Sequence, residues 1–297
     1  MAVHNRSRQA DAALIGNTIV WGATFTLVKS ALTDVSPLVF LVLRFTLATL
    51  ALLALFRRGW NAGCREVRAG ALVGVFLFSG YLLQTLGLQF TSAPKSAFLT
   101  GLTSVMVPLL GAAVYRIKPQ ASELLGVITA TVGLGLMTLE GPLGSVNRGD
   151  VLTVGCAMAF AAHILTIGYY SGKIAFDRLS LIQVATAAGL AGSLFWWVAP
   201  PHLVWRPTVV YAILVTGLLA TAAAFTVQAW AQCYTTPTRT ALIYTLEPVF
   251  AWLTSYWLIG EGLSRRAAAG AALILGGVVL VELKPRNPRP HPSNSRV

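Results

Sequence analysis

Charged residues are scarce in this chain of 297 residues. Asp, Glu, Lys and Arg make up 11% of it, whereas 56% is hydrophobic and the mean hydropathy is +0.70. A soluble protein of this size has roughly a quarter of its residues charged. The composition therefore excludes a separate soluble catalytic domain and predicts a protein that lies almost entirely within a membrane.

Cysteine and the common catalytic motifs are scarce too. Cys64, Cys156 and Cys233 are far apart and odd in number, so we expect neither a disulfide framework nor a metal site. The sequence has no GxxxxGK[ST] phosphate loop and no HExxH, CxxC or GxSxG motif, patterns that bind nucleotide phosphates, hold metals or present a nucleophilic serine. We therefore expect no cofactor, no metal and no enzymatic activity, so that a gradient or a partner supplies any energy.

Long apolar runs are what the sequence does contain. A hydrocarbon core roughly 30 Å thick requires about 20 apolar residues per helix, and such stretches fill nearly the whole chain. Prolines stand near three of the predicted helix starts, where the missing N–H costs no hydrogen bond. We predict ten spanning helices, at residues 12–30, 37–56, 69–90, 94–115, 122–139, 150–171, 179–198, 209–232, 237–259 and 266–283.

Both ends of the chain are polar. Residues 1–11 precede the first apolar run, which lacks a small-residue cleavage site, so we expect a short cytoplasmic segment and a retained first span rather than a removed signal peptide. Residues 284–297 are rich in proline and polar residues. This composition predicts a disordered cytoplasmic tail.

The distribution of Lys and Arg predicts the orientation. Short cytoplasmic loops carry an excess of these residues and face anionic lipid, which explains the net charge of +12 without nucleic acid. Placing the N-terminus inside puts 15 basic residues on the cytoplasmic side and 5 on the other, so we expect both termini in the cytoplasm of a multi-pass protein of the bacterial inner membrane. The inner set is Arg6, Arg8, Arg57, Arg58, Arg65, Arg68, Arg116, Lys118, Lys173, Arg178, Arg239, Lys284, Arg286, Arg289 and Arg296; the outer set is Lys95, Arg148, Arg206, Arg265 and Arg266.

The second half of the chain repeats the first at an offset of 144 residues. Residues 90–139 align with 234–283 without a gap, and nine of the 50 positions are identical. Lys95 aligns with Arg239 in the similar segments FTSAPKSA and YTTPTRTA. The repeat points to a duplicated membrane unit.

Each predicted repeat has five spans, which is an odd number. The halves must therefore cross the membrane in opposite directions, as in secondary transporters whose site lies between inverted repeats. We predict an all-α membrane protein of ten transmembrane helices built as two inverted five-helix repeats, over residues 12–139 and 150–283.

Four segments resemble the EamA-type members of the drug/metabolite transporter superfamily. They are WGATFTLVK (21–29), LRF (43–45), TSAPKSAFLTGLTSVMVPLL (91–110) and YTLEPVFAWLTSYWLIGE (244–261). The resemblance covers about residues 11–283. It implies a ten-helix inverted-repeat fold in which the solute crosses a cavity lined mainly by the first, third, fourth, sixth, eighth and ninth helices.

The repeat and the resemblance together predict a secondary transporter. We expect it to move a small metabolite, an amino acid or similar, across the cytoplasmic membrane by alternating access, as an exporter. The alternatives are a membrane-embedded enzyme acting on lipid-linked substrates and an adaptor without transport. The expected partners are the small-molecule solute and the lipid bilayer, with no nucleic acid, and the protein is a monomer or a homodimer.

Ionisable residues within spans are the first candidates for function, because a charge in hydrocarbon costs several kcal/mol unless it is paired or faces water. Glu247 lies near the middle of a predicted span, and Pro248 after it can kink the helix. Glu247 either pairs with Arg44 or Lys29 as a packing clamp, or binds solute or a proton. We expect Arg44 to form a structural ion pair and Lys29 to extend its amine to the interface.

Polar and aromatic residues complete the candidate site. Lys95 and Arg239 begin equivalent helices, whose positive dipole ends favour holding an anionic group from either side in turn; alternatively they are interfacial cations. His163 either relays protons or is a hydrogen-bonded core residue. The predicted substrate-binding residues are Trp21, Gln84, Lys95, His163, Gln228, Arg239, Tyr244 and Glu247.

Overall fold

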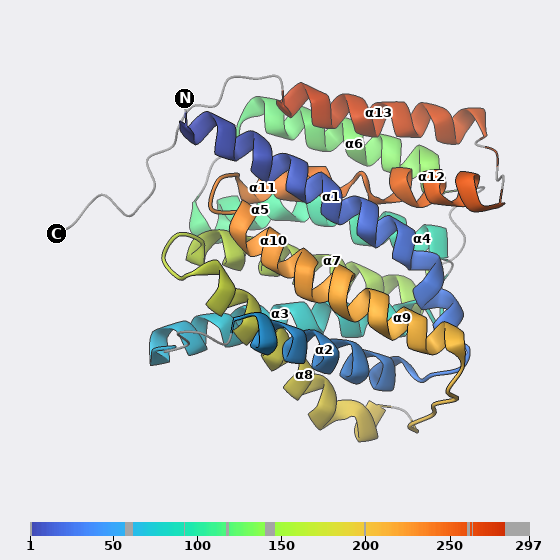
Figure 1. The fold of residues 1–297 in the computed structure, drawn as a ribbon. Helices are drawn as coiled ribbons and strands as arrows, with labels where there is room; N and C mark the ends of the chain where they lie inside the picture. The colour runs from blue at the N-terminus through green and yellow to red at the C-terminus, as the bar shows by residue number, and fades with distance from the viewer. Residues whose placement is uncertain are drawn as a thin grey trace.

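The computed structural model of the chain is a bundle of helices (Figure 1). It describes residues 2–56, 62–91, 93–116, 119–139, 146–198, 200–259, 262 and 264–282. Across these ranges no strand forms, and only two isolated bridges occur, Val35 with Leu203 and Ser171 with Ile174. The predicted all-helical class is therefore confirmed. The predicted tail over 284–297 lies outside the described residues.

Thirteen α-helices and one π-helical turn form within the described ranges. The first half contains α1 (Ala2–Ala31), α2 (Pro37–Leu55), α3 (Cys64–Gly87), α4 (Ala93–Gly101), α5 (Thr103–Tyr115) and α6 (Ala121–Thr138). The second half contains α7 (Arg148–Tyr170), α8 (Phe176–Val198), α9 (Pro207–Gly217), the π turn η1 (Leu218–Ala223), α10 (Ala224–Ala231), α11 (Pro237–Tyr244), α12 (Glu247–Ile259) and α13 (Arg265–Glu282).

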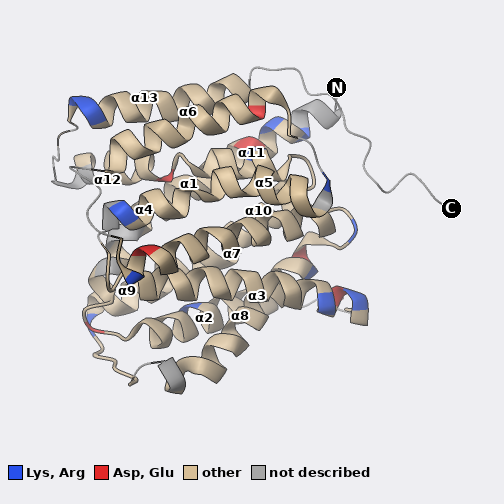
Figure 2. Ribbon diagram, turned by 180° about the vertical axis from the view of Figure 1, so that it is seen from behind, with Lys and Arg blue, Asp and Glu red and all other residues tan. Residues whose placement is uncertain are grey.

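Seven helical stretches of the described chain are long and apolar enough to cross a membrane. They are Pro37–Leu55, Cys64–Gly87, Lys95–Val114, Ala121–Thr138, Arg148–Tyr170, Phe176–Trp196 and Pro207–Ala231. Three predicted spans, over 12–30, 237–259 and 266–283, are not among them; the second of these divides into the short helices α11 and α12, and α13 begins with two arginines. Most charged residues lie near the two ends of the bundle (Figure 2), which leaves an apolar middle.

Two predicted helices are each broken in the structure. The predicted helix over 237–259 divides into α11 and α12 because Pro248 has no N–H to donate to the carbonyl of Tyr244, one turn earlier, and its ring clashes with that carbonyl. The predicted helix over 94–115 divides at Leu102, where the side chains of Thr103 and Ser104 donate to carbonyls of the preceding turn. The breaks lie at equivalent positions of the alignment.

The helix bounds themselves recur at the predicted offset. Adding 144 to the bounds of α5 and α6 gives those of α12 and α13, and α11 begins 144 residues after α4. The structure thus preserves, helix by helix, the spacing that the sequence shows.

Helices α6 and α13 lie side by side along their whole length (Figure 1). Their glycines make reciprocal contacts: a Cβ added at Gly133 would lie 2.5 Å from the carbonyl oxygen of Gly270, and one added at Gly277 would lie 2.7 Å from that of Gly126. Such small residues let two backbones approach closely.

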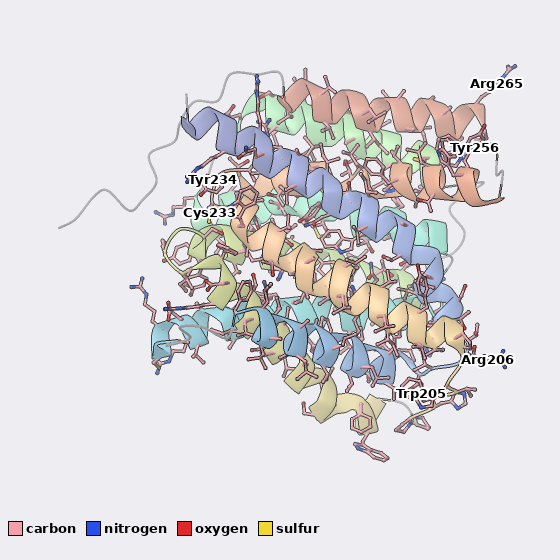
Figure 3. The ribbon with its side chains drawn as sticks, in the orientation of Figure 1. Trp205, Arg206, Cys233, Tyr234, Tyr256 and Arg265 are labelled. Atoms are coloured by element: carbon pink, nitrogen blue, oxygen red, sulfur yellow. The ribbon has the colours of Figure 1, made fainter. Side chains whose placement is uncertain are left out.

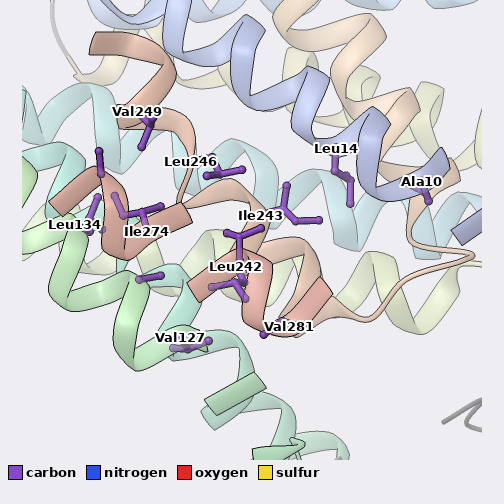
Figure 4. Close-up of a cluster of buried hydrophobic side chains, with 14 residues drawn as sticks. Ala10, Leu14, Val127, Leu134, Leu242, Ile243, Leu246, Val249, Ile274 and Val281 are labelled. Atoms are coloured by element: carbon purple, nitrogen blue, oxygen red, sulfur yellow. The ribbon is translucent and has the colours of Figure 1, made fainter. Parts of the chain in front are cut away.

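One buried apolar cluster joins α6 and α13 to α1 and α11. It contains Val127 and Leu134 of α6, Ile274 of α13, Leu242 of α11 and Leu14 of α1, among others (Figure 4). The start of α1 and the end of α13 lie at the same end of the bundle (Figure 1). We refer to this as the Tyr234 end, and to the opposite one, where Arg206 and Arg265 lie, as the Arg265 end (Figure 3).

Candidate functional site

Helix α1 meets the break between α11 and α12 at Gly22. A Cβ added there would lie 2.8 Å from the carbonyl oxygen of Glu247 and 2.7 Å from the backbone nitrogen of Ala251. This contact brings the neighbouring Trp21 to Tyr244, and the two rings meet edge to face with centroids 4.8 Å apart. Two predicted site residues from different halves of the chain are therefore in direct contact.

Phe225 of α10 extends this contact into an aromatic cluster. Its ring centroid lies 5.8 Å from Trp21, 6.1 Å from Tyr81 and 5.5 Å from His163. We call Trp21, Tyr81, His163, Phe225 and Tyr244 the central aromatic cluster. Its members come from α1, α3, α7, α10 and α11, so that it lies where both halves meet.

The π turn η1 supplies polar anchors beside this cluster. The carbonyl of Ala220 accepts a hydrogen bond from the indole N–H of Trp21 at 2.9 Å and another from Arg44 at 3.2 Å. Thr221 accepts from Nε of Arg44 at 2.7 Å. A π turn shifts the helical hydrogen-bond register, and such turns are frequent at functional sites.

Arg44 is held by neutral partners. Besides Ala220 and Thr221, it donates to the hydroxyl of Tyr81 at 3.0 Å and lies over that ring, 4.5 Å from its centroid. It is only 4% exposed. The predicted ion pair of Arg44 is wrong for the described part of the chain, because hydroxyls, a carbonyl and an aromatic face stabilise the guanidinium in place of a carboxylate.

Glu247 is the acidic residue nearest the cluster. It begins α12 and is partly accessible, and its charge acts on Tyr81, Tyr244 and Cys156. Among the described residues no hydrogen bond or ion pair reaches its carboxylate. The predicted clamp with Arg44 is therefore absent, and the side chain of Lys29 lies outside the described residues.

The side chain of His163 is more buried than that of Trp21. It is 1% exposed, and its Nε2 lies 2.8 Å from Oε1 of Gln183. The amide of Asn17 donates to the carbonyl of Ala224 at 2.8 Å. The buried hydroxyl of Tyr244 has no hydrogen-bond partner within the described ranges, although Asn17 is close to it. The structure thus brings together Trp21, His163, Tyr244 and Glu247 of the predicted set.

The two predicted glutamines differ in their surroundings. Gln84 is partly accessible and contacts Thr100 at 3.5 Å, and Thr100 in turn contacts Cys156, which links Gln84 to the vicinity of Glu247. Gln228 is 1% exposed and donates at 3.2 Å to Gln232, the residue that follows α10.

Lys95 and Arg239 lie at opposite ends of the bundle, away from the cluster. Lys95 of α4 pairs with Asp150 of α7 at 2.6 Å, at the Arg265 end. Arg239 of α11 pairs with Asp11 of α1 at 3.4 Å, at the Tyr234 end. Each pair joins a fourth predicted helix of one half to the first helix of the other half.

Sequence reasoning missed several residues of this site. Tyr81 and Phe225 stand in apolar runs without a distinguishing neighbour, and the π turn falls in the small-residue segment LLATAA, so the sequence carries no local signal for them. No group of three or more His, Cys, Asp or Glu that could hold a metal occurs in the part of the chain that the structure describes.

Known proteins resemble this chain along almost its whole length. A model described as the EamA-like transporter family matches residues 8–139 and again 147–283. An uncharacterized transporter of Archaeoglobus fulgidus is 34% identical over 93% of this chain and 86% of that protein. The uncharacterized transporter YetK of Bacillus subtilis is 26% identical over 97% and 89%. A solved crystal structure with 17% identity superposes with a TM-score of 0.78, covering 93% of this chain and 98% of that one, which shows the fold alone.

Proposed function

Because the chain belongs to the EamA-like transporter family, we propose that it is a ten-helix secondary transporter that exports a small metabolite, an amino acid or a similar solute, by alternating access. The family and the seven apolar stretches make it a multi-pass membrane protein, whose partners are a small-molecule solute and the bilayer.

Ten crossings require that α1, the pair α11 and α12, and α13 also span the membrane. Three observations support this: the helix bounds recur at the offset of 144 residues, the family model matches each half once, and α6 and α13 make reciprocal glycine contacts. Such a contact is what a pseudo-two-fold axis between two inverted repeats produces. The repeats then occupy residues 12–139 and 150–283, close to the two family matches.

The solute site lies at the central aromatic cluster. The contact between Trp21 and Tyr244 carries this proposal, because it joins the two repeats beside a broken helix and a π turn. Irregular helix geometry in a membrane occurs where the backbone is buried in protein or lines a cavity, and transporters place their sites at such breaks between repeats. His163, Gln84 and Gln228 add polar groups around it.

The two ion pairs close the two ends. Lys95 with Asp150, and Arg239 with Asp11, each join one repeat to the other. Both pairs are formed at once, which suits an occluded state. Opening one end separates one pair and leaves the other intact, so that the solute meets one compartment at a time. In this proposal Lys95 and Arg239 can meet a passing anionic group only when their end opens.

The basic asymmetry of the loops supports an inner-membrane protein with both termini in the cytoplasm. This orientation puts the Tyr234 end, with the start of α1, on the cytoplasmic side. The protein is a monomer or a homodimer.

An efflux screen tests the function. Cells or proteoliposomes containing the full chain should release one class of small solute faster than controls, with and without a pH gradient. Trp21→Ala and Tyr244→Ala should reduce this efflux at unchanged protein levels. The matched controls Trp196→Ala and Trp257→Ala, at positions 70% and 81% exposed, should not. Normal efflux in both site variants refutes the proposed site.

A further inference from the structure

The centre of the bundle has a partly accessible acidic side chain, that of Glu247. Glu247 is partly accessible, and no described residue forms an ion pair or hydrogen bond with its carboxylate. The nearby cation, Arg44, is 4% exposed and already donates to three neighbouring groups. Among the described side chains, a solute that enters the cluster therefore meets a carboxylate without meeting an available cation.

Only the second half of the chain has an acidic residue at this aligned position. Thr103 stands 144 residues before Glu247 and uses its hydroxyl to donate to the carbonyls of Thr100 and Ala157. The site therefore offers one negative group, which suits a solute with a single positive charge.

Aromatic rings lie near Glu247. Trp21 and Tyr244 are in contact with each other next to the first turn of α12, and Tyr81 and Tyr244 lie within electrostatic reach of Glu247. The faces of Trp and Tyr attract an ammonium group and also pack against an apolar body. A carboxylate beside such rings forms a binding site for an organic cation, whereas a second carboxylate would be repelled.

We propose that the solute is a monoamine cation without a carboxylate, with its ammonium on Glu247 and its apolar part against Trp21 and Tyr244. This inference rests on the proposed function and narrows its solute from amino acids and similar metabolites to amines. Because no described side chain at this site offers an available cation to a carboxylate on the solute, an amino acid should bind more weakly than the amine that lacks its carboxylate.

Four related probes test this order. Phenethylamine, phenylalanine, 3-phenylpropionate and 2-phenylethanol share a ring and differ in charge. Titrated calorimetrically into the full chain in lipid nanodiscs, phenethylamine should bind at least tenfold more tightly than the other three. Glu247→Gln should remove that preference, because it keeps the shape of the side chain and removes its charge. The control Glu66→Gln, at an ion pair with Arg178 near the Tyr234 end, should retain it.

The outcomes separate this inference from the proposed function. The inference is overturned if phenylalanine or 3-phenylpropionate binds as tightly as phenethylamine. It is also overturned if the protein shows no preference among the four probes, or binds none of them. If Glu247→Gln does not fold, Trp21→Leu replaces it and should weaken phenethylamine binding at least threefold; unchanged binding overturns the inference. A neutral or anionic solute whose efflux depends on Trp21 and not on Glu247 would contradict the amine while leaving the transporter proposal in place.

Discussion

Two adjacent glycines of α13 should respond oppositely to the same substitution. A Cβ added at Gly277 would lie 2.7 Å from the carbonyl oxygen of Gly126 and 3.1 Å from the nitrogen of Ala130, whereas one added at Gly276 meets nothing within 4 Å. Gly277→Ala must therefore push α6 and α13 apart, and overpacking of this kind costs about 1–3 kcal/mol. Gly276→Ala gains helix propensity, up to about 1 kcal/mol.

The two variants should therefore differ by roughly 1–4 kcal/mol in the free energy of unfolding. At about 2–4 °C per kcal/mol, the value for chains of 150–250 residues, thermal unfolding temperatures should differ by roughly 2–16 °C. The assay is thermal unfolding of each purified variant in the same detergent, followed by size-exclusion chromatography. Gly133→Ala, the equivalent change on α6, should behave like Gly277→Ala. Equal unfolding temperatures for the Gly276 and Gly277 variants would refute the close backbone contact between α6 and α13.

Three further predictions follow from the contacts at the site and at the ends. Replacing Lys95 by Gln and Asp150 by Asn should each alter efflux. In a double-mutant cycle the free-energy change of the double variant should differ from the sum of the two single changes by about 0.5–3 kcal/mol. Additive effects would exclude a coupled pair. Arg44→Met should lower stability by about 2–4 kcal/mol, since it removes three hydrogen bonds from buried partners, and a yield of folded protein equal to wild type would contradict this. Cys64, which is exposed, should react with a thiol reagent faster than Cys233, because burial raises the pKa of the Cys233 thiol and leaves less thiolate at neutral pH; the reverse order would argue against this placement.

Helix positions could be predicted from the sequence because apolar length and the positions of proline determine where a chain crosses lipid. The range 37–56 was predicted within one residue of α2, and 122–139 within one residue of each end of α6. Pro248 predicts a kink at Glu247. In the structure this kink is a full break between α11 and α12. The break at Leu102 has no proline at the same place and was not predicted.

The site could be predicted only in part. Trp21, Tyr244 and Glu247 were identified because they stand in motif segments or carry a charge within a span, and the structure brings them together. The partners of Arg44 could not be predicted, because the residue types of a segment do not show that a π turn frees one of its carbonyls. The arrangement of Phe225 among three other rings likewise depends on how helices from both halves pack.

Alternating access requires the two ends of the bundle to open in turn. Spin labels on the exposed residues Thr33 and Arg265 report on the Arg265 end, because Thr33 adjoins Asp34, which pairs with Arg206. Labels on the exposed residues Arg8 and Lys173 report on the Tyr234 end, because Ser7 donates to Tyr234 and Gly172 lies beside Cys233. Pulsed electron paramagnetic resonance on both label pairs, with and without a transported solute, measures the two separations. The account predicts that solute shifts the two distance distributions in opposite directions. Two ends that widen together, or that both stay fixed while the same sample transports, would contradict it.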